Sequence, residues 1–383
     1  MLTFDCDVAV IGGGVGGGSA ALAFAGAGSS VRLFERRDLA RDPNRGDLLH
    51  PPTVAILRRL GLVELFEARG AVRLRGVSVV DPSGEIDLHT TVPGSMILNH
   101  AEMEAAFLDA AASAGATIRP APARALVPDG DGWRVATDDG ATRARLLVGA
   151  DGAGSLTRRT LGIDLADDHE YDNCIVVLHA TCPSWLEPDQ GWQVIHPEGA
   201  VFILPTTPRG RVRLVVLIRR DDARRWMTAG EAQLDDLLGR RHPRLSGLDL
   251  IRRGGSHVYR LRRTHAARYT GPRAALVGDA AHTIHSMGGQ GLNIAIQDSV
   301  KLAELVAPAL HGGDGAAVAA ALHDYEAVRR PINAEVIERA DAASHQARPG
   351  ADAFARALAF YRQAMADPAH LQRNRPSLGG REG

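Results

Sequence analysis

The first 35 residues show a pattern of apolar and polar positions typical of a strand–helix–strand unit. Residues 7–11 form a short β-branched run, residues 19–27 form an alanine-rich stretch suited to a close-packed helix, and residues 31–35 form a second apolar run that ends at an acid. The unit spans about 30 residues, the length expected of a parallel crossover. The pattern therefore predicts two parallel strands joined by a helix.

Further along, two blocks change to short apolar runs separated by Pro, Gly and Asp, at residues 72–98 and 175–218. Within the second block, the runs at 201–204 and 212–218 flank a turn and predict a hairpin. We expect both blocks to pair in one mostly antiparallel sheet. This sheet would be inserted twice into the first fold, because a later glycine motif at Gly278 returns to it. After Gly278 the pattern is mainly helical.

The sequence thus predicts an α/β protein with a Rossmann-like dinucleotide-binding domain, an inserted and mostly antiparallel β-sheet domain, and C-terminal helices. The polar end of the chain, with further Pro and Gly, predicts a loose tail. The expected boundaries are discontinuous: residues 1–71, 99–168 and 263–367 for the dinucleotide-binding domain, 72–98 and 169–262 for the substrate-binding domain, and 368–383 for the tail.

The composition of the 383 residues narrows the function. With 45% hydrophobic and 23% charged residues, it is typical of a soluble globular protein. The 44 Lys and Arg residues nearly balance the 45 Asp and Glu residues, so no global field favours nucleic acid or an anionic membrane. The three cysteines are odd in number and match no metal-ligand spacing. We therefore expect a reducing, cytoplasmic setting, no disulfide, no metal and a small-molecule partner.

Residues 8–31 contain no charged side chain, which raises the question of a membrane segment. Eight glycines in this window argue against a transmembrane helix. Asp5 and Asp7 stand where a signal peptide needs a basic flank. We expect no stable membrane insertion.

Gly12, Gly14 and Gly17 follow the first predicted strand and fit the Gly-x-Gly-x-x-Gly pattern. These glycines permit a tight turn, close approach of the backbone to a pyrophosphate, and close packing of helix on strand. Any glycine-rich turn can match the pattern by itself. However, Glu35 lies about 20 residues on, at the end of the second strand, where a carboxylate accepts hydrogen bonds from an adenosine ribose. The combination predicts a dinucleotide site.

Two later stretches belong to the same interpretation. The first, residues 149–158, follows an apolar strand and contains Asp151 in an Asp-Gly turn, which on its own is ordinary. The second runs from Gly278 and Asp279 to residues 288–293, where glycines precede a helix. Such a helix start presents amide donors and the positive end of the helix dipole, which would stabilise the negative charge of a reduced flavin.

With these stretches, the chain resembles the FAD-dependent monooxygenases of the para-hydroxybenzoate hydroxylase type, the single-component aromatic hydroxylases, over most of its length. The resemblance implies an FAD-binding domain of the glutathione-reductase type and NAD(P)H as co-substrate. In the family the first motif holds the ADP half, and the late motif holds the ribitol and the flavin ring. The cofactor-binding positions implied here are Gly12, Gly14, Gly17, Glu35, Arg36, Arg45, His100, Asp151, Asp279, Gly289, Gly291, Leu292 and Asn293.

The chain departs from the family pattern at two places. His285, Ser286 and Met287 stand where the family usually carries Pro shortly before the late glycines. His100 stands where the family commonly has Arg or Gln. Both positions face the flavin or its entrance in relatives, so the departures bear on substrate geometry and cofactor retention.

The resemblance also implies a mechanism. NAD(P)H reduces FAD, O2 adds to the reduced ring, and the flavin hydroperoxide hydroxylates an electron-rich carbon of an aromatic or polyketide-like small molecule. A base that removes the proton of a phenol would assist this step. We expect four residues to take part in catalysis or to contact substrate: His50, Arg45, Ser286 and His285. The other candidates for the base are His179, His196 and Tyr171, and the candidates for lining the substrate cavity are Trp185, Trp192 and Phe202.

Several alternatives stay open on the same scaffold. One is an epoxidase or reductase of an isoprenoid or other alkene. A flavin halogenase is disfavoured, because residues 192–197 lack the second Trp of the halogenase signature and Lys301 is the single lysine of the chain. Another is a non-catalytic FAD-binding protein, which only the His285-Ser286 departure supports. Monomer and homodimer are both compatible with the sequence.

Overall fold

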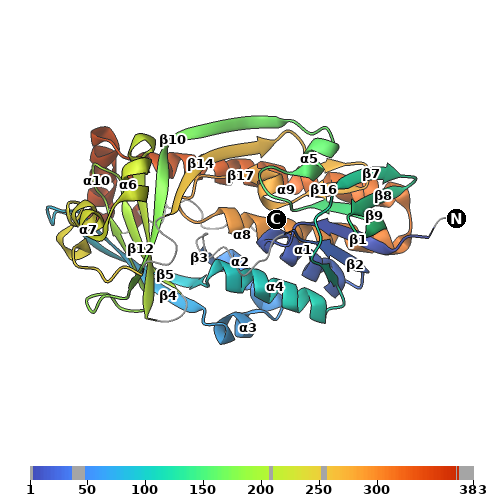
Figure 1. Ribbon diagram of the computed structural model, residues 1–383, viewed down its shortest axis with the longest axis horizontal. Coiled ribbons are helices and arrows are strands. Elements are labelled where there is room, and N and C mark those ends of the chain that lie inside the picture. Colours follow the sequence, from blue (N-terminus) through green and yellow to red (C-terminus); the bar gives the residue numbers. More distant parts are fainter. Residues whose placement is uncertain (1–2, 37–47, 207–209, 252–256, 368, 371–383) are drawn as a thin grey trace.

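A computed structural model describes residues 3–36, 48–206, 210–251, 257–367 and 369–370 of the chain. In this part of the chain, two sheets lie at opposite ends of an elongated molecule, with long helices between and beside them (Figure 1). The helices are α1 (Val15–Gly26), α2 (Pro51–Arg59), α3 (Val63–Ala68), α4 (His100–Ser113), α5 (Leu156–Thr160), α6 (Ala223–Thr228), α7 (Glu231–Gly239), α8 (Gly291–Gly312), α9 (Gly315–Ala347) and α10 (Ala351–Ala366).

The first sheet, sheet A, has the strand order β15-β16-β9-β1-β2-β6, with a β7–β8 hairpin attached to β9. The pairs β1–β2, β1–β9, β2–β6 and β9–β16 are parallel. The β1–β2 pair is the one that the strand–helix–strand pattern predicts. Its strands are β1 (Cys6–Ile11), β2 (Val31–Phe34), β6 (Thr117–Arg119), β7 (Ala125–Asp129), β8 (Gly132–Thr137), β9 (Gly140–Gly149), β15 (Thr270–Gly271) and β16 (Ala274–Leu276).

Helices α1, α4, α8 and α9 pack with sheet A around one large hydrophobic core. The strand β1 is apolar at almost every position because a parallel sheet covered by helices has no solvated face. The helix α1 is rich in Gly and Ala and buried nearly all round, which allows its close packing against α4 and α8. This core fixes the carboxyl ends of β1, β2, β9 and β16 side by side at one edge.

The second sheet, sheet B, has the order β17-β14-β10-β13-β12-β11-β4-β5-β3 and is antiparallel except at the β11–β4 pair. Residues 72–98 and 175–218 therefore do join in one mostly antiparallel sheet, as predicted, and β12 and β13 form the predicted hairpin. Its strands are β3 (Leu48–Leu49), β4 (Val72–Val80), β5 (Asp87–Ile97), β10 (Leu165–Thr181), β11 (Gln190–Val194), β12 (Val201–Thr206), β13 (Arg211–Arg219), β14 (His257–Ala266) and β17 (His282–Thr283).

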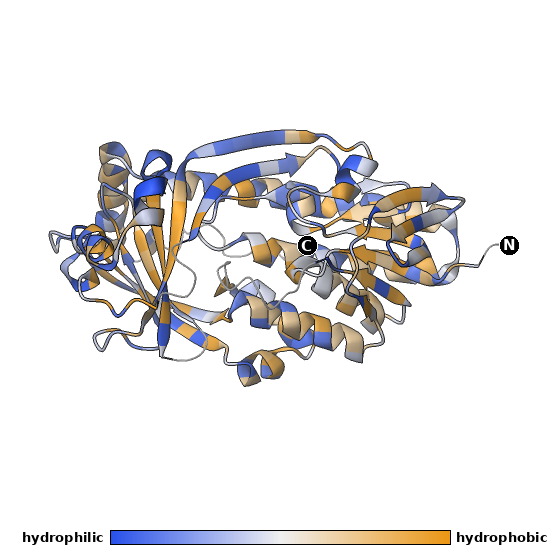
Figure 2. Ribbon diagram, in the orientation of Figure 1, coloured by the Kyte–Doolittle hydropathy of each residue, from blue (hydrophilic) through white to orange (hydrophobic). Residues whose placement is uncertain are grey.

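Sheet B is covered on both faces. Helices α6 and α7 contribute to a hydrophobic cluster with β10–β13, and α10 packs with Val79, Ile86 and Ile195. Figure 2 shows apolar residues concentrated on the strands of both sheets, whereas the stretch of β10 and β14 that runs from one sheet toward the other is mainly hydrophilic. These two strands therefore bridge the two ends of the molecule along a solvated edge. No helix in the described part of the chain is long and apolar enough to cross a membrane.

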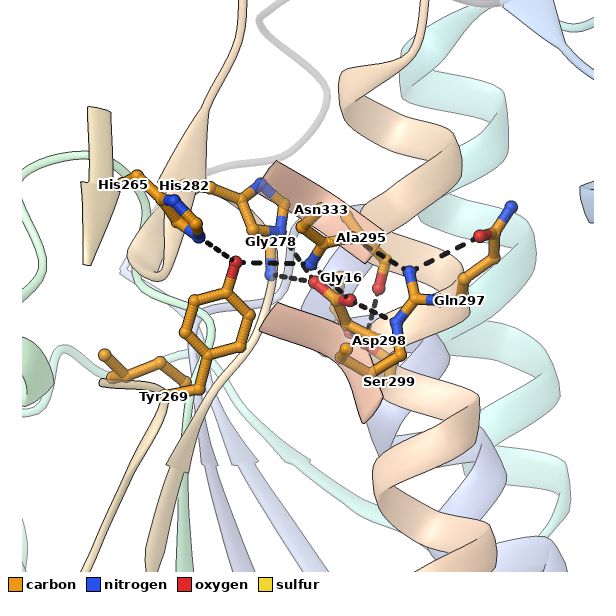
Figure 3. A network of polar contacts seen from close by, with 12 residues as sticks. Gly16, His265, Tyr269, Gly278, His282, Ala295, Gln297, Asp298, Ser299 and Asn333 are labelled. Carbon is orange, nitrogen blue, oxygen red and sulfur yellow. Dashed lines mark hydrogen bonds and ion pairs between the residues drawn. The ribbon is translucent and has the colours of Figure 1, made fainter. Parts of the chain in front are cut away.

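A buried polar network centred on Asp298 ties these elements together (Figure 3). Asp298 lies on α8 and is 0% exposed. One carboxylate oxygen accepts from Nε of Arg329 at 2.8 Å and from Nδ2 of Asn333 at 2.9 Å, both on α9. The other accepts from Nε2 of His282 at 2.7 Å and, more distantly, from the amide of Gly278 at 3.4 Å. One carboxylate thus holds α9 and the turn after β16 against α8.

The network continues to the loop before β15. The Asn333 amide donates to the hydroxyl of Tyr269 at 3.3 Å, and this hydroxyl lies 2.9 Å from Nε2 of His265. Burial lowers the pKa of His265 to about 4, so its ring is neutral and Nε2 can accept the Tyr269 proton. The Tyr269 hydroxyl thus accepts from Asn333 and donates to His265.

We expect Asp298→Ala to lower the free energy of unfolding by about 3–5 kcal/mol, because it leaves the Arg329 charge buried without its counterion. Burial alone would raise the pKa of Asp298, but the charges of Arg329 and His282 and the hydrogen bonds from His282 and Asn333 hold it below its usual value. Denaturant unfolding followed by circular dichroism measures the loss. Asp168→Ala is the control, since the Asp168–Arg262 pair is exposed and its loss changes stability only slightly. Equal effects of the two substitutions would contradict the assigned role.

Candidate functional site

The turn after β1 and the first turn of α1 each accept only glycine at one position. Gly12 has φ +100°, and a Cβ there would lie 2.4 Å from the carbonyl oxygen of Ala150. A Cβ on Gly17 would lie 1.8 Å from the carbonyl oxygen of Gly12. Both distances are far below van der Waals contact, so the backbones of the turn, of α1 and of the segment after β9 pack directly on one another.

The start of α1 presents backbone donors that no side chain caps, and an acid lies beside them. The N-cap residue Gly14 makes no side-chain cap, and the first turn holds no acidic residue. Glu35 follows β2 and is 5% exposed, and its carboxylate accepts from the amide of Gly13 at 2.6 Å. Backbone amides at a helix start bind phosphate, and a carboxylate at the end of the second strand binds ribose hydroxyls. The arrangement fits the ADP half of FAD.

The middle motif, residues 149–158, forms hydrogen bonds mainly within its own turn. The Asp151 carboxylate accepts from Ser155 Oγ at 2.5 Å and from the amide of Thr157 at 2.9 Å, which fixes the start of α5. Arg158 is buried and donates to the carbonyl of Ala280 at 2.8 Å. The middle motif is therefore joined to the late motif, and Asp151 shapes the turn that Gly12 packs against.

The late motif provides a second helix start that is open to a ligand. Gly288 and Gly289 have φ +81° and +61° in the turn before α8, a conformation that favours glycine. The N-cap residue Gln290 is 1% exposed, and in the described part of the chain neither its amide oxygen nor its amide nitrogen has a hydrogen-bond partner. Buried amides of this kind are normally paired. A flavin pyrimidine edge, with its carbonyl and N–H groups, would supply partners here.

Asn293 fixes this turn to the segment before α2. Its amide donates to the carbonyls of Leu48 at 2.9 Å and Gly289 at 2.7 Å, and its oxygen accepts from the amide of His50 at 2.8 Å. Nε2 of His50 lies 2.5 Å from the carbonyl oxygen of Gly288. Because a carbonyl only accepts, His50 carries a proton on Nε2. Two contacts from opposite sides thus hold the Gly288–Gly289 turn.

A cavity of ≈ 630 Å³ lies between sheet B, α9, α10 and residues 286–289. A volume of this size suits one small organic molecule. Strands β4, β10, β12 and β13 supply much of its apolar wall. The described residues that line it include no Asp or Glu, and the polar ones are His50, Thr90, Ser95, Gln193, Arg213, Ser286, Arg339, Gln346 and Tyr361.

The structure brings only some of the expected catalytic residues to this cavity. His50, Ser286 and the cofactor candidate Gly289 line it. His285 is fully buried and does not line it, and Arg45 lies outside the described residues. The remaining cofactor candidates are spread along the same edge of sheet A: Arg36 is exposed after β2, Asp279 is exposed after β16, Leu292 lies in the first turn of α8, and His100 begins α4 with Nε2 3.3 Å from Glu104 Oε1.

The alternative bases lie away from the cavity. His179, His196 and Tyr171 are absent from its walls. Burial, together with the nearby Arg213 charge, lowers the pKa of His179 to about 4, and burial raises the pKa of the Tyr171 hydroxyl. Of the three aromatic candidates, Trp192 and Phe202 line the cavity, while Trp185 packs edge-on against Trp192 with ring centroids 4.8 Å apart.

Three polar wall residues escaped the sequence analysis. Gln193 lies on β11, Arg213 lies on β13, and Tyr361 lies on α10 and donates to Gln193 Oε1 at 3.3 Å. Polarity alone could not single out the first two, because Gln190 on β11 and Arg211 on β13 are also polar and do not line the cavity. No local feature of the sequence indicated that residues of α10 would line the cavity.

The sequence is similar to an FAD-binding family and to known hydroxylases. The sequence profile of a family described as an FAD binding domain matches residues 5–340. The chain is 32% identical to ubiquinone hydroxylase UbiL of Rhodospirillum rubrum over 359 residues, which covers 88% of this chain and 80% of the relative. It is 28% identical to 3-demethoxyubiquinol 3-hydroxylase of Escherichia coli over 350 residues, which covers 87% of this chain and 88% of the relative.

Solved structures show the same fold. The p-nitrophenol 4-monooxygenase PnpA of Pseudomonas putida aligns with a TM-score of 0.83 over 100% of both chains at 23% identity. A ternary complex of aklavinone-11 hydroxylase with FAD and aklavinone aligns with a TM-score of 0.77 at 26% identity, covering 91% of this chain and 70% of that one. The predicted fold class is therefore confirmed.

We expect Glu35→Ala to weaken FAD binding about 10- to 100-fold, because a charged hydrogen-bond acceptor for the ribose and for the Gly13 amide is lost. Quenching of flavin fluorescence on titration of the apoprotein measures the affinity. Glu64→Ala, at an exposed acid on α3, is the matched control. Equal FAD affinity in Glu35→Ala and in the wild type would remove Glu35 from the cofactor site.

Proposed function

The chain belongs to the FAD binding domain family and is an FAD-dependent monooxygenase, and we propose that it hydroxylates a small aromatic or polyketide-like molecule held in the cavity beside α8, with NAD(P)H and O2 as co-substrates. One observation carries the proposal. The apolar cavity is bounded by residues 286–289, which lead directly into the open start of α8. A substrate in the cavity would therefore lie next to a flavin whose pyrimidine edge rests on that helix start.

Bound FAD would supply the redox chemistry and the activation of O2. The chain's own residues position it. We assign the ADP half to Gly12, Gly14, Gly17 and Glu35, the ribitol to Asp279, and the ring to the turn from Gly289 to Asn293. Of these, the fit rests on the uncapped start of α1, the Glu35 carboxylate and the unpaired amide of Gln290.

The cavity walls favour an electron-rich substrate. Apolar side chains would exclude water from the space between substrate and bound FAD. Among the described lining residues the arginines are Arg213, which is buried on β13, and Arg339, which pairs with Glu335 on α9. Arg213 lowers the cost of developing negative charge on a phenolic ring.

His50 is placed to manage a substrate proton. Its Nε2–H donates to the Gly288 carbonyl, so in the neutral ring the basic lone pair is on Nδ1. The side chain lines the cavity and lies at the end nearest α8. We therefore assign His50 as the base that takes the hydroxyl proton of a phenolic substrate at Nδ1. Nδ1 is buried in the structure, so this role requires that substrate binding expose it.

The relatives favour hydroxylation over the alternatives. These relatives are named as hydroxylases and monooxygenases, including an anhydrotetracycline monooxygenase of Streptomyces rimosus at 29% identity. Likeness to the flavin-dependent halogenase CmlS, at 21% identity, extends to the fold alone. Epoxidation, halogenation and loss of catalysis each lack a supporting observation at the site.

The direct test is a screen of the FAD-loaded protein against phenols, isoprenoid quinols, quinolones, pyridines and polycyclic polyketide aromatics. We expect a subset of them to accelerate NADH or NADPH oxidation and to gain one oxygen atom by mass spectrometry, with 18O label taken from O2. Flavin that stays oxidised with both nicotinamides and every substrate would overturn the proposal. Oxidation of NAD(P)H to give only peroxide would show a substrate outside the screened classes.

We expect His50→Asn to lower kcat for a phenol by about 100-fold, the contribution of one general base, while FAD affinity changes less than about threefold. The loss should shrink when the phenol is acidic enough to be ionised already. His323→Asn, at an exposed histidine on α9, serves as the control. A loss of the same size for ionised and un-ionised phenols would show that His50 acts by holding Gly288 and not as a base.

A further inference from the structure

His285 lies immediately outside the substrate cavity, behind the residues that form its flavin end. Its side chain is 0% exposed, and its ring meets the ring of Tyr171 edge to face, with centroids 4.6 Å apart. The next residues, Ser286 and Met287, line the cavity. His285 therefore precedes a cavity-lining residue in the sequence but does not reach the cavity itself.

The backbone fixes which nitrogen of His285 carries the proton. The amide of Met287 donates to Nδ1 of His285 at 3.2 Å. A backbone amide has no alternative role, so Nδ1 must be unprotonated. The proton of the neutral ring is therefore on Nε2, which requires an acceptor.

Asn173 on β10 supplies that acceptor. Its side-chain nitrogen lies 3.4 Å from Nε2 of His285, which would place two donors face to face, while its buried side-chain oxygen has no partner among the described residues. The oxygen and nitrogen of an Asn amide are assigned from their partners. Rotating the Asn173 amide by half a turn puts Oδ1 opposite Nε2–H and resolves the conflict. The Met287 contact therefore determines the hydrogen-bonding pattern of both side chains.

We propose that His285 and Asn173 are positioning residues that fix the Ser286–Met287 part of the loop and thereby set how substrate lies against the flavin. This inference rests on the proposed function, in which residues 286–289 separate substrate from FAD. His50 and Asn293 hold the Gly288–Gly289 half of the same loop. His285 and Asn173 hold the other half, from β10 on the opposite side.

The surroundings keep this pair neutral. Burial lowers the pKa of His285 to about 4, with the positive charges of His345 and Arg348 adding to the effect and Asp341 opposing it. The Tyr171 hydroxyl donates to Asp341 at 2.7 Å, and Arg263 pairs with Asp341 at 3.1 Å. The ring that packs on His285 is therefore itself held between β10, β14 and α9.

Three substitutions at His285 separate the two hydrogen bonds. In His285→Asn, the amide oxygen replaces Nδ1 and can accept from Met287. In His285→Gln, the longer amide replaces Nε2 and can reach Asn173 but not the Met287 amide. His285→Leu removes both contacts at similar volume. His169→Leu is the matched control, because His169 stacks on the other side of Tyr171 at 4.8 Å and is exposed.

The primary measurement is hydrogen–deuterium exchange of the peptide that contains residues 284–290 in the FAD-loaded protein, followed by mass spectrometry. We expect exchange about tenfold faster in His285→Leu and His285→Gln, the effect of one lost buried hydrogen bond. We expect His285→Asn to stay within about threefold of wild type. The affinity for FAD should follow the same order, and His169→Leu should match wild type in both.

Unchanged exchange in His285→Leu, or exchange in His285→Asn as fast as in His285→Leu, would overturn the proposal. If His285→Leu does not fold, the comparison of the Asn and Gln variants still decides it. Failure of the proposed function is distinguishable, because it would appear as absent flavin reduction or absent product in the wild type, whereas loop exchange is measured without turnover.

Discussion

The carboxylate of Asp298 is the interaction on which the site depends. It joins α8 to α9 through Arg329 and Asn333, and to the turn after β16 through His282 and the Gly278 amide. The next residue, Ser299, donates to the carbonyl of Gly16 at 2.7 Å and so holds the first turn of α1 against α8. A fully buried charge is tolerated only when its partners stay in place. The two helix starts that would meet FAD are therefore held in one fixed relation by adjacent residues of one helix.

The sequence predicted the parts of the site whose geometry is local. The glycine spacing at Gly12 and Gly17 reflects contacts within one strand–turn–helix unit, and Glu35 follows from the length of that unit. The late glycines were equally visible, because positive φ at Gly288 and Gly289 demands their residue type. The resemblance to a known family added the identity of the cofactor, which spacing alone left at the level of a dinucleotide.

The substrate side was hidden from sequence because distant segments build it. Gln193 and Tyr361 meet across strand β11 and helix α10, and Arg213 enters the wall from β13. No spacing rule connects these residues. The burial of His285 was also hidden from sequence. Its position next to residues 286–289 could be read from the chain. Its burial could not, because it results from β10 passing behind these residues, with Asn173 and Tyr171 covering the ring.

Residues 286–289 therefore lie between the candidate cofactor site and the cavity, and these two regions are built differently. On one side, backbone amides and glycines set the geometry, and few substitutions are sterically possible. On the other, the walls are side chains on strands and on α9 and α10, where residue size can vary without disturbing the backbone. Such a division lets one cofactor site serve many substrates, consistent with the range of compounds named for the relatives.

The single parallel pairing in sheet B, between β4 and β11, has a consequence for how the protein is made. The hairpin of β4 and β5 leaves the ribosome early, but its partner strand follows only after the chain has run from Val80 to Gln190 and has crossed sheet A on the way. Until then one long edge of the hairpin is unpaired, and such edges invite association with other chains. Pairing of such distant segments is also slow. The cavity beside sheet B is consequently among the last parts of the nascent chain to close, because its walls need strands from both segments.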